Sequence, residues 1–203
     1  SDGTVGANKQ AVKIIGEYAK PYVQGYFSYD SKKSGGLTVS HLRFGDTPIR
    51  SEYLIQEADY IACHNESFLN SGYDLTEGLK ENGIFVLNTQ YGAEQIGGKL
   101  PKEMVHALIK KNARLYLIDA GKLAHSLGLG NRINMIMQGA FFHLTGILPQ
   151  EKALACLKNS IQTAYGKKGA DIVEKNIKAA EYGFRETKLV PVELLQSTRE
   201  ERE

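Results

Sequence analysis

The 203-residue chain is long enough to bury one sizeable core and is most simply a single domain. Its 42% hydrophobic and 24% charged residues are typical of globular proteins, and its net charge of +2 gives no basis for a nucleic acid or membrane partner. Two widely separated cysteines, Cys63 and Cys156, predict reduced thiols and are too few to hold an iron–sulfur cluster. No membrane-spanning stretch or signal peptide is recognisable, so we expect a cytoplasmic protein.

The predicted elements alternate between short apolar strands and helices. The N-terminal part is predicted to form a helix over 9–20, ended by Pro21, and strands over 23–29, 37–44 and 60–63. The middle is predicted to form a helix over 74–81 with Gly83 as its stop, a strand over 84–87, a helix over 101–111 and a strand over 115–118. Three helices, over 133–144, 151–165 and 170–182 with Gly183 as a stop, make up the last third.

This alternation predicts an α/β fold. We expect a layered domain with a largely parallel sheet flanked by helices, and a helical C-terminal third that covers the sheet. After Pro191 the sequence becomes polar, which predicts that residues 193–203 form a linker or a frayed tail. The domain proper would then span residues 1–192.

The first candidate ligand loop lies almost at the N-terminus and leads into the first predicted helix. It reads Gly3-Thr4-Val5-Gly6-Ala7-Asn8-Lys9. Glycines let backbone N–H groups converge, a helix start adds unpaired donors, and lysine supplies a positive charge, so the loop is suited to phosphate. Its spacing matches neither a Walker A loop nor the dinucleotide fingerprint. The alternative is that Thr4 or Asn8 only caps the helix behind a flexible terminus.

The second candidate loop joins the strands predicted over 23–29 and 37–44. It contains Ser31, Lys32 and Lys33, followed by Ser34 and two glycines. A polar hairpin loop with exposed lysines is the alternative interpretation. Because loops at the same strand ends meet in open α/β sheets, the two loops together favour a ligand with several phosphates.

No catalytic centre is recognisable in the sequence. Cys63 and His64 are adjacent in a predicted strand and would point to opposite faces, so they are unsuited to act together as nucleophile and base. We expect Cys63 to pack in the core. A contact of His64 or Asn65 with a ligand stays open. The histidines show no metal-ligand spacing, and no carboxylate pair suggests acid/base chemistry.

The helix predicted over 133–144 carries Met135 and Met137 in apolar surroundings. Core packing is the default interpretation. A subunit contact is the alternative, because methionine-rich faces adapt to partners.

Several of these segments, in order, resemble a known family. The stretches 2–16, 29–36, 39–45, 62–65 and 132–135 are similar to the gamma domain of pyruvate:ferredoxin (flavodoxin) oxidoreductases, which belong to the 2-oxoacid:acceptor oxidoreductases. The similarity runs from Asp2 to about Val192, so it covers nearly the whole chain.

The resemblance implies a function beyond what the patterns indicate. The family decarboxylates pyruvate oxidatively on thiamine diphosphate, passes electrons through iron–sulfur clusters to ferredoxin or flavodoxin, and gives the acetyl group to coenzyme A. It implies that the gamma domain captures coenzyme A, while thiamine diphosphate, Mg and the [4Fe-4S] clusters belong to the remaining domains or subunits. Around the phosphates it places residues from both loops, namely Gly3, Thr4, Val5, Gly6, Ala7, Asn8, Lys9, Ser31, Lys32 and Lys33.

The family pattern has a strand before the first loop, and this sequence starts after it. We therefore expect an excised domain, a processed fragment or a subunit completed by a partner, without turnover on its own. Two other functions stay open: a docking module that packs the thiamine and cluster domains together, and a free nucleotide-binding protein.

Overall fold

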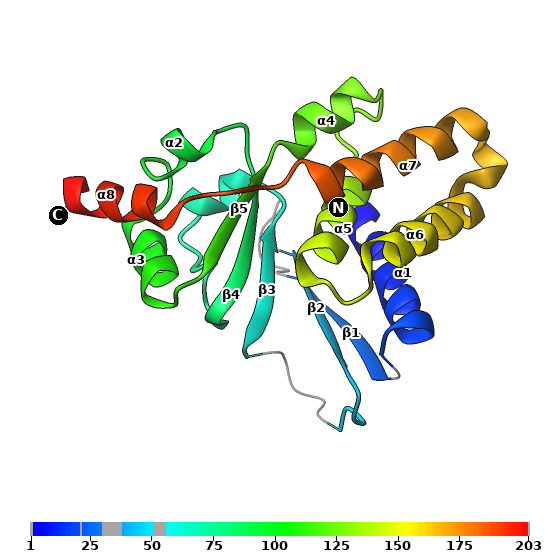
Figure 1. The fold of residues 1–203 in the computed structure, drawn as a ribbon, viewed down its shortest axis with the longest axis horizontal. Helices are drawn as coiled ribbons and strands as arrows, with labels where there is room; N and C mark the ends of the chain where they lie inside the picture. Colours follow the sequence, from blue (N-terminus) through cyan, green and yellow to red (C-terminus); the bar gives the residue numbers. More distant parts are fainter. Residues whose placement is uncertain (1, 21, 30–37, 51–55, 203) are drawn as a thin grey trace.

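A computed structural model describes residues 2–20, 22–29, 38–50 and 56–202, and it shows an α/β fold (Figure 1). The strands are β1 (Tyr22–Tyr29), β2 (Thr38–Gly45), β3 (Ala58–Cys63), β4 (Leu79–Asn88), β5 (Arg114–Ile118) and β6 (Lys188–Leu189). The helices are α1 (Asp2–Tyr18), α2 (Ala93–Ile96), α3 (Lys102–Lys110), α4 (Ala120–Ser126), α5 (Asn134–Thr145), α6 (Gln150–Tyr165), α7 (Ala170–Arg185) and α8 (Val192–Arg202). Two 3₁₀ helices, η1 (Glu66–Asn70) and η2 (Gly166–Lys168), complete the described elements.

The main sheet has the order β3-β4-β5-β6 and is parallel except for the short β6. In β4 the four residues 84–87 are all buried, as expected for a strand covered on both faces. Ile84 and Val86 face one core cluster, and Phe85 and Leu87 face the other. The predicted largely parallel sheet flanked by helices is confirmed.

The two faces of the sheet carry different helices. The first cluster includes residues from α1, α4, α5, α6 and α7, and the second includes residues from α2, α3 and α8. Figure 1 shows these two groups on opposite sides of the strands. The C-terminal third is helical as predicted, but its last helix joins the second group and its other helices join the first.

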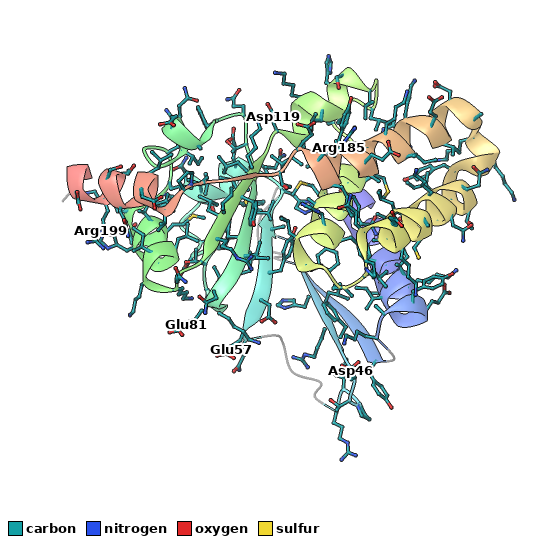
Figure 2. The ribbon with its side chains drawn as sticks, in the orientation of Figure 1. Asp46, Glu57, Glu81, Asp119, Arg185 and Arg199 are labelled. Atoms are coloured by element: carbon teal, nitrogen blue, oxygen red, sulfur yellow. The ribbon has the colours of Figure 1, made fainter. Side chains whose placement is uncertain are left out.

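Strands β1 and β2 form a separate antiparallel hairpin in the register Tyr22↔Gly45 to Tyr29↔Thr38. The hairpin packs on α1, and an ion pair with a nitrogen to oxygen distance of 2.9 Å joins Lys20, just after α1, to Asp46, just after β2. Asp46 is labelled at this end of the hairpin in Figure 2. The predicted segment 30–37 between these strands lies outside the described residues.

The N-terminal segment is helical, which corrects the prediction of a glycine loop. Helix α1 already begins at Asp2, so residues 3–9 form its first turns and no loop precedes the helix. Ala11, Ile14 and Ile15 form the buried side of α1. The helix therefore extends through two glycines that the sequence suggested as loop residues.

The prediction of a helix over 74–81 is wrong, because this segment forms a turn and then a strand. The Asp74 carboxylate accepts hydrogen bonds from the backbone N–H and the hydroxyl of Thr76, at 2.9 and 2.7 Å, which closes a turn. Gly78 then has a φ of +74°, which ends any helix, and β4 starts at Leu79. Gly83, predicted as a helix stop, lies inside β4.

The ends of two C-terminal helices also differ from prediction. Gly183 is buried inside α7, which continues to Arg185. The segment 193–203 was predicted as a linker or frayed tail, but its described residues 193–202 belong to α8, whose Leu195 is only 2% exposed in the second cluster. Among the described helices, none has the length and apolar character to cross a membrane.

Candidate functional site

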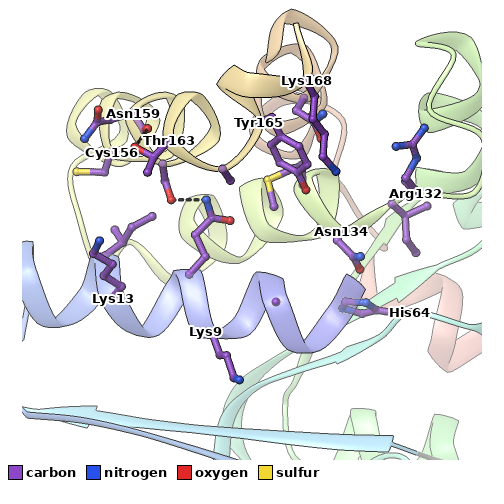
Figure 3. Close-up of a pocket in the computed structure, with 18 of the residues that line it drawn as sticks. Lys9, Lys13, His64, Arg132, Asn134, Cys156, Asn159, Thr163, Tyr165 and Lys168 are labelled. Atoms are coloured by element: carbon purple, nitrogen blue, oxygen red, sulfur yellow. Dashed lines mark hydrogen bonds between the residues drawn. The ribbon is translucent and has the colours of Figure 1, made fainter. Parts of the chain in front are cut away.

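An open cavity of about 930 Å³ lies where α1 meets α5, α6 and the end of β3 (Figure 3). It follows one side of α1 from Gly6 to Tyr18 and is bounded by α6 residues from Cys156 to Tyr165. His64 and Asn65, which follow β3, and residues 131–135 at the start of α5 close one end. This end corresponds to the carboxyl ends of the parallel strands, where ligands bind in open α/β sheets.

The side chain of Asn88, at the carboxyl end of β4, fixes the backbone beside the cavity. Its Nδ2 donates to the carbonyl of His64 at 2.9 Å, and its Oδ1 accepts from the N–H of Ala120 at 2.9 Å. The next residue, Thr89, donates its hydroxyl to the carboxylate of Glu66 at 2.6 Å. The turn after β3 is thus held by hydrogen bonds from the neighbouring strand, which gives His64 a defined position.

The walls of the cavity are held together across a long sequence separation. The side-chain amide of Gln10 on α1 donates to the hydroxyl of Ser160 on α6. This bond spans the space between the two helices (Figure 3). Neutral polar side chains continue along α6 beside it, namely Asn159 and Thr163.

The charged residues that line the cavity are mostly cationic. They are Lys9, Lys13, Arg132 and Lys168 against a single carboxylate, Glu17. Glu17 lies 4.0 Å from the ammonium of Lys13 in the same helix. The cavity therefore has a net positive charge, which favours an anionic ligand.

Two of these cations are oriented by contacts at the end of the cavity near α5. The Nε of Arg132 donates to the carbonyl of Leu129 at 3.1 Å, which leaves the other guanidinium N–H groups for a ligand. The ammonium of Lys168 lies above the ring of Tyr165, 5.4 Å from the ring centroid. Helix α5 starts between them without a side-chain cap at Ile133, and a helix start is favourable for anions.

His64 is the titratable group most affected by burial in this cavity. Burial lowers the pKa of His64 to about 4, so the imidazole is neutral at physiological pH. Its Nδ1 is buried and has no hydrogen-bond partner among the described residues. The ring lies beside the N-terminal end of α1, close to Asn134 (Figure 3).

The two cysteines are free thiols. Cys63 is buried as predicted, and its Sγ donates to the carbonyl of Asn65 at 3.2 Å. Burial raises the pKa of both thiols, which disfavours the reactive thiolate. The prediction that Cys63 packs in the core is confirmed.

The candidate residues of the first loop lie in α1, and two of them, Gly6 and Lys9, line the cavity. The ammonium of Lys9 extends from the side of α1 that faces the hairpin (Figure 3). For Gly3, Thr4, Val5, Ala7 and Asn8 the structure describes only the helical backbone. Ser31, Lys32 and Lys33 lie outside the described residues.

Arg132, Lys168 and the polar side of α6 line the cavity although no motif in the sequence indicates them as ligand residues. Arg132 lies in a segment shared with the family, and Lys168 belongs to a lysine pair that is typical of a solvated helix end. These residues are far from α1 in the sequence, so only the packing of α6 and α5 on α1 brings them together. In the part of the chain that the structure describes, no group of three or more His, Cys, Asp or Glu side chains could hold a metal ion.

Three solved structures with a similar fold carry names of oxoacid oxidoreductases or of their subunits. Pyruvate oxidoreductase subunit PORC of Thermotoga maritima matches with a TM-score of 0.72 and 23% identity, over 93% of this chain and 92% of the other. A gamma subunit of a keto/oxoacid ferredoxin oxidoreductase of Geobacter sulfurreducens matches with a TM-score of 0.61 and 19% identity, over 91% and 89%. A 2-oxoglutarate:ferredoxin oxidoreductase of Magnetococcus marinus, with 2-oxoglutarate, coenzyme A and succinyl-CoA bound, matches with a TM-score of 0.61 and 16% identity, over 94% of this chain and 28% of the other. The chain therefore shares its fold with these two subunits and with part of the third protein.

Sequence comparison identifies the family. Residues 1–186 match the family model described as pyruvate ferredoxin/flavodoxin oxidoreductase. The pyruvate:ferredoxin oxidoreductase of Moorella thermoacetica is 52% identical over 181 residues, which are 89% of this chain and 15% of that protein. A probable pyruvate-flavodoxin oxidoreductase of Escherichia coli is 50% identical over 193 residues, 95% of this chain and 16% of that protein. This chain belongs to the pyruvate ferredoxin/flavodoxin oxidoreductase family, as the resemblance predicted, and it spans about one sixth of the length of these relatives.

Proposed function

We propose that this chain is the coenzyme A-capturing domain of a pyruvate:ferredoxin or pyruvate:flavodoxin oxidoreductase. In the whole enzyme, pyruvate and coenzyme A give acetyl-CoA, CO2 and a proton, and two electrons pass to ferredoxin or flavodoxin. The observation that carries the proposal is the cationic cavity at the start of α5. The names of the relatives and the coenzyme A bound in the Magnetococcus marinus neighbour support it.

The chemistry of the cavity residues fits this ligand. Coenzyme A has a pyrophosphate, a 3′-phosphate and an uncharged arm with two amides and a hydroxyl. Arg132 and Lys168 match the phosphates, with Lys9 and Lys13 further along α1. Neutral polar groups on α6 match the arm.

We assign the remaining contacts to the residues that the family pattern indicates. In this proposal Gly3, Thr4, Val5, Gly6, Ala7, Asn8 and Lys9 lie around the phosphates, with Ser31, Lys32 and Lys33 opposite them. The chain's own residues bind and orient coenzyme A and perform no bond-breaking step. Thiamine diphosphate, Mg and the [4Fe-4S] clusters belong, in this proposal, to the rest of the enzyme.

The alternative function, a docking module that packs the thiamine and cluster domains together, has less support. It required the face around Met135 and Met137 to be buried in a partner, but both side chains pack in the core of this chain and are 5% and 2% exposed. In the relatives, the matching segment is a small part of a larger enzyme or a subunit of a multisubunit complex. Its capture role and its assembly role are therefore not in conflict.

The proposal is tested in the full-length enzyme that carries this domain. We expect Arg132→Gln together with Lys168→Gln to raise the KM for coenzyme A at least about tenfold, since each lost charge-assisted phosphate contact costs about 1.5 kcal/mol or more. The KM for pyruvate should stay unchanged. Lys110→Gln, an exposed lysine on α3, is the matched control.

Lys32→Ala with Lys33→Ala tests the second loop in the same assay, and we expect a raised coenzyme A requirement there too. Calorimetric titration with coenzyme A, dephospho-coenzyme A and ATP then identifies the ligand. Weaker binding after loss of the 3′-phosphate supports coenzyme A capture. An unchanged KM in both variants, or a preference for ATP, would overturn the proposal in favour of a docking or a nucleotide-binding role.

A further inference from the structure

One side chain in the wall of the cavity has a polar atom with no function in the phosphate site. It is the Nδ1 of His64, which is buried and has no hydrogen-bond partner among the described residues. A buried polar atom without a partner destabilises a fold by about 1–3 kcal/mol unless a ligand or water supplies the bond. Such an atom in the wall of a ligand cavity is a candidate for ligand contact.

The position of His64 is determined by its surroundings. The backbone carbonyl of His64 is held by Asn88, which also fixes the start of α4. The imidazole therefore extends from a turn with little freedom at the carboxyl end of the sheet, beside Asn134 and the N-terminal end of α1 (Figure 3). A preorganised group of this kind loses little entropy on binding.

The electrostatic character of His64 differs from that of its neighbours in the cavity. Burial keeps the imidazole neutral, with one nitrogen as donor and the other as acceptor. Arg132 and Lys168 already supply positive charge for phosphates. A neutral ring adds no charge, so it is better matched to an uncharged amide or hydroxyl.

We propose that His64 is a ligand-contacting specificity residue whose Nδ1 makes one hydrogen bond to an amide or hydroxyl of the pantetheine arm of coenzyme A. This inference rests on the proposed function and adds the part of the ligand that lies at this end of the cavity. The phosphates then contact Arg132 and Lys168, and the part of the uncharged arm next to them passes His64 at the end of β3 before it reaches the polar groups of α6.

The test is equilibrium binding of three probes to the full-length enzyme, measured by calorimetry or by competition. The probes are coenzyme A, pantetheine and adenosine 3′,5′-bisphosphate. We expect His64→Phe to weaken coenzyme A and pantetheine about tenfold, the usual effect of one hydrogen bond in a buried site, and to leave the bisphosphate unchanged. His64→Asn should retain most of the affinity, because its amide atoms lie at the same level of the side chain as Nδ1. His64→Gln, whose amide lies one bond further out, should not.

The thermal midpoint of the ligand-free enzyme separates binding from stability. His64→Phe removes an unpartnered polar atom, so the midpoint should stay the same or rise. If His64→Phe loses affinity for the bisphosphate as much as for coenzyme A, the ring contacts the nucleotide half. If its affinities for all three probes are unchanged, His64 is a packing residue. Either result overturns the inference. If His64→Phe does not fold, equal affinities of the Asn and Gln variants for coenzyme A would overturn it as well. Should the wild-type enzyme bind neither coenzyme A nor pantetheine, the proposed function itself fails.

Discussion

The neutral state of His64 in the folded chain has a consequence for stability as well as for binding. Its pKa is lowered to about 4 by burial, whereas a histidine in an unfolded chain titrates near 6.5. Between these two pH values the unfolded chain binds a proton that the folded chain does not. Unfolding is therefore favoured progressively as the pH falls through this range.

We expect the free energy of unfolding to fall between about pH 6.5 and about pH 4, and to fall less steeply in His64→Gln, which cannot titrate there. Urea unfolding of this chain at several pH values in that range measures both slopes. His125→Gln, at an exposed position on α4, is the matched control for loss of an imidazole. Parallel slopes for the wild type and His64→Gln would contradict the assignment.

At the scale of single residues, the sequence predicted on which side of a strand a residue lies better than it predicted the hydrogen-bond partners of its side chain. The alternation of side chains in a strand predicted that Cys63 and His64 diverge, and Cys63 is indeed in the core. It could not predict that Nδ1 of His64 is left without a partner, because that depends on which residues of α1 and α5 pack beside it. The orientation of Arg132 likewise depends on the carbonyl of Leu129, in a turn that sequence patterns do not specify.

Among the elements, the crossing of α5 and α7 explains a wrong helix boundary. Gly139 of α5 and Gly183 of α7 face each other, and a Cβ on Gly183 would lie 2.6 Å from the backbone nitrogen of Ala140 and 2.8 Å from the Cα of Gly139. The two backbones thus approach too closely for any side chain at that point. A glycine required for such packing has the same signature in the sequence as a glycine that stops a helix.

Gly183→Ala should destabilise the chain by about 1–3 kcal/mol, because the added methyl forces the two helices apart. Chemical denaturation measures the loss. Gly98→Ala is a suitable control, since its Cβ would have only the carbonyl oxygen of Gln95 nearby, at 3.7 Å. Equal stability of the Gly183 variant and the wild type would contradict the close crossing.

The prediction of a helix over 74–81 was wrong for a different reason. Its composition is compatible with a helix, but the bonds from Thr76 to the Asp74 carboxylate stabilise a turn instead. Strands over 84–87 and 115–118 were predicted correctly because continuous apolar runs are needed on a sheet covered on both faces.

Across the whole molecule, the alternation of strands and helices was enough to predict the α/β class, but not how the chain closes the second face of the sheet. The polar composition after Pro191 predicted a tail, yet α8 packs on α3 through Leu195. The apolar side chains of α8 are confined to its first turn, which is a weak helix signal in a sequence, and their burial depends on the presence of α3. The separation of the β1–β2 hairpin from the main sheet could not be predicted either, because strand patterns do not specify partners.

Leu195→Ala should lower the free energy of unfolding by about 2–4 kcal/mol, as expected for a fully buried leucine. Val192→Ala, at a position that is 40% exposed in the same helix, should cost much less. Thermal or urea unfolding of both variants compares the two positions. Equal small effects would indicate that the segment is the frayed tail first expected.

The bond between Gln10 and Ser160 also has a consequence for how the protein is made. Helix α1 has its buried side against α5 and α6, which are translated more than a hundred residues later. At a translation rate of roughly 5–20 residues per second, α1 emerges from the ribosome on the order of ten seconds before α6 exists. The side of α1 that faces α5 and α6 lacks these partners during that interval, although the β1–β2 hairpin, which is translated directly after α1, is already available to pack on the helix. We therefore expect α1 to reach its full set of native contacts only late in synthesis.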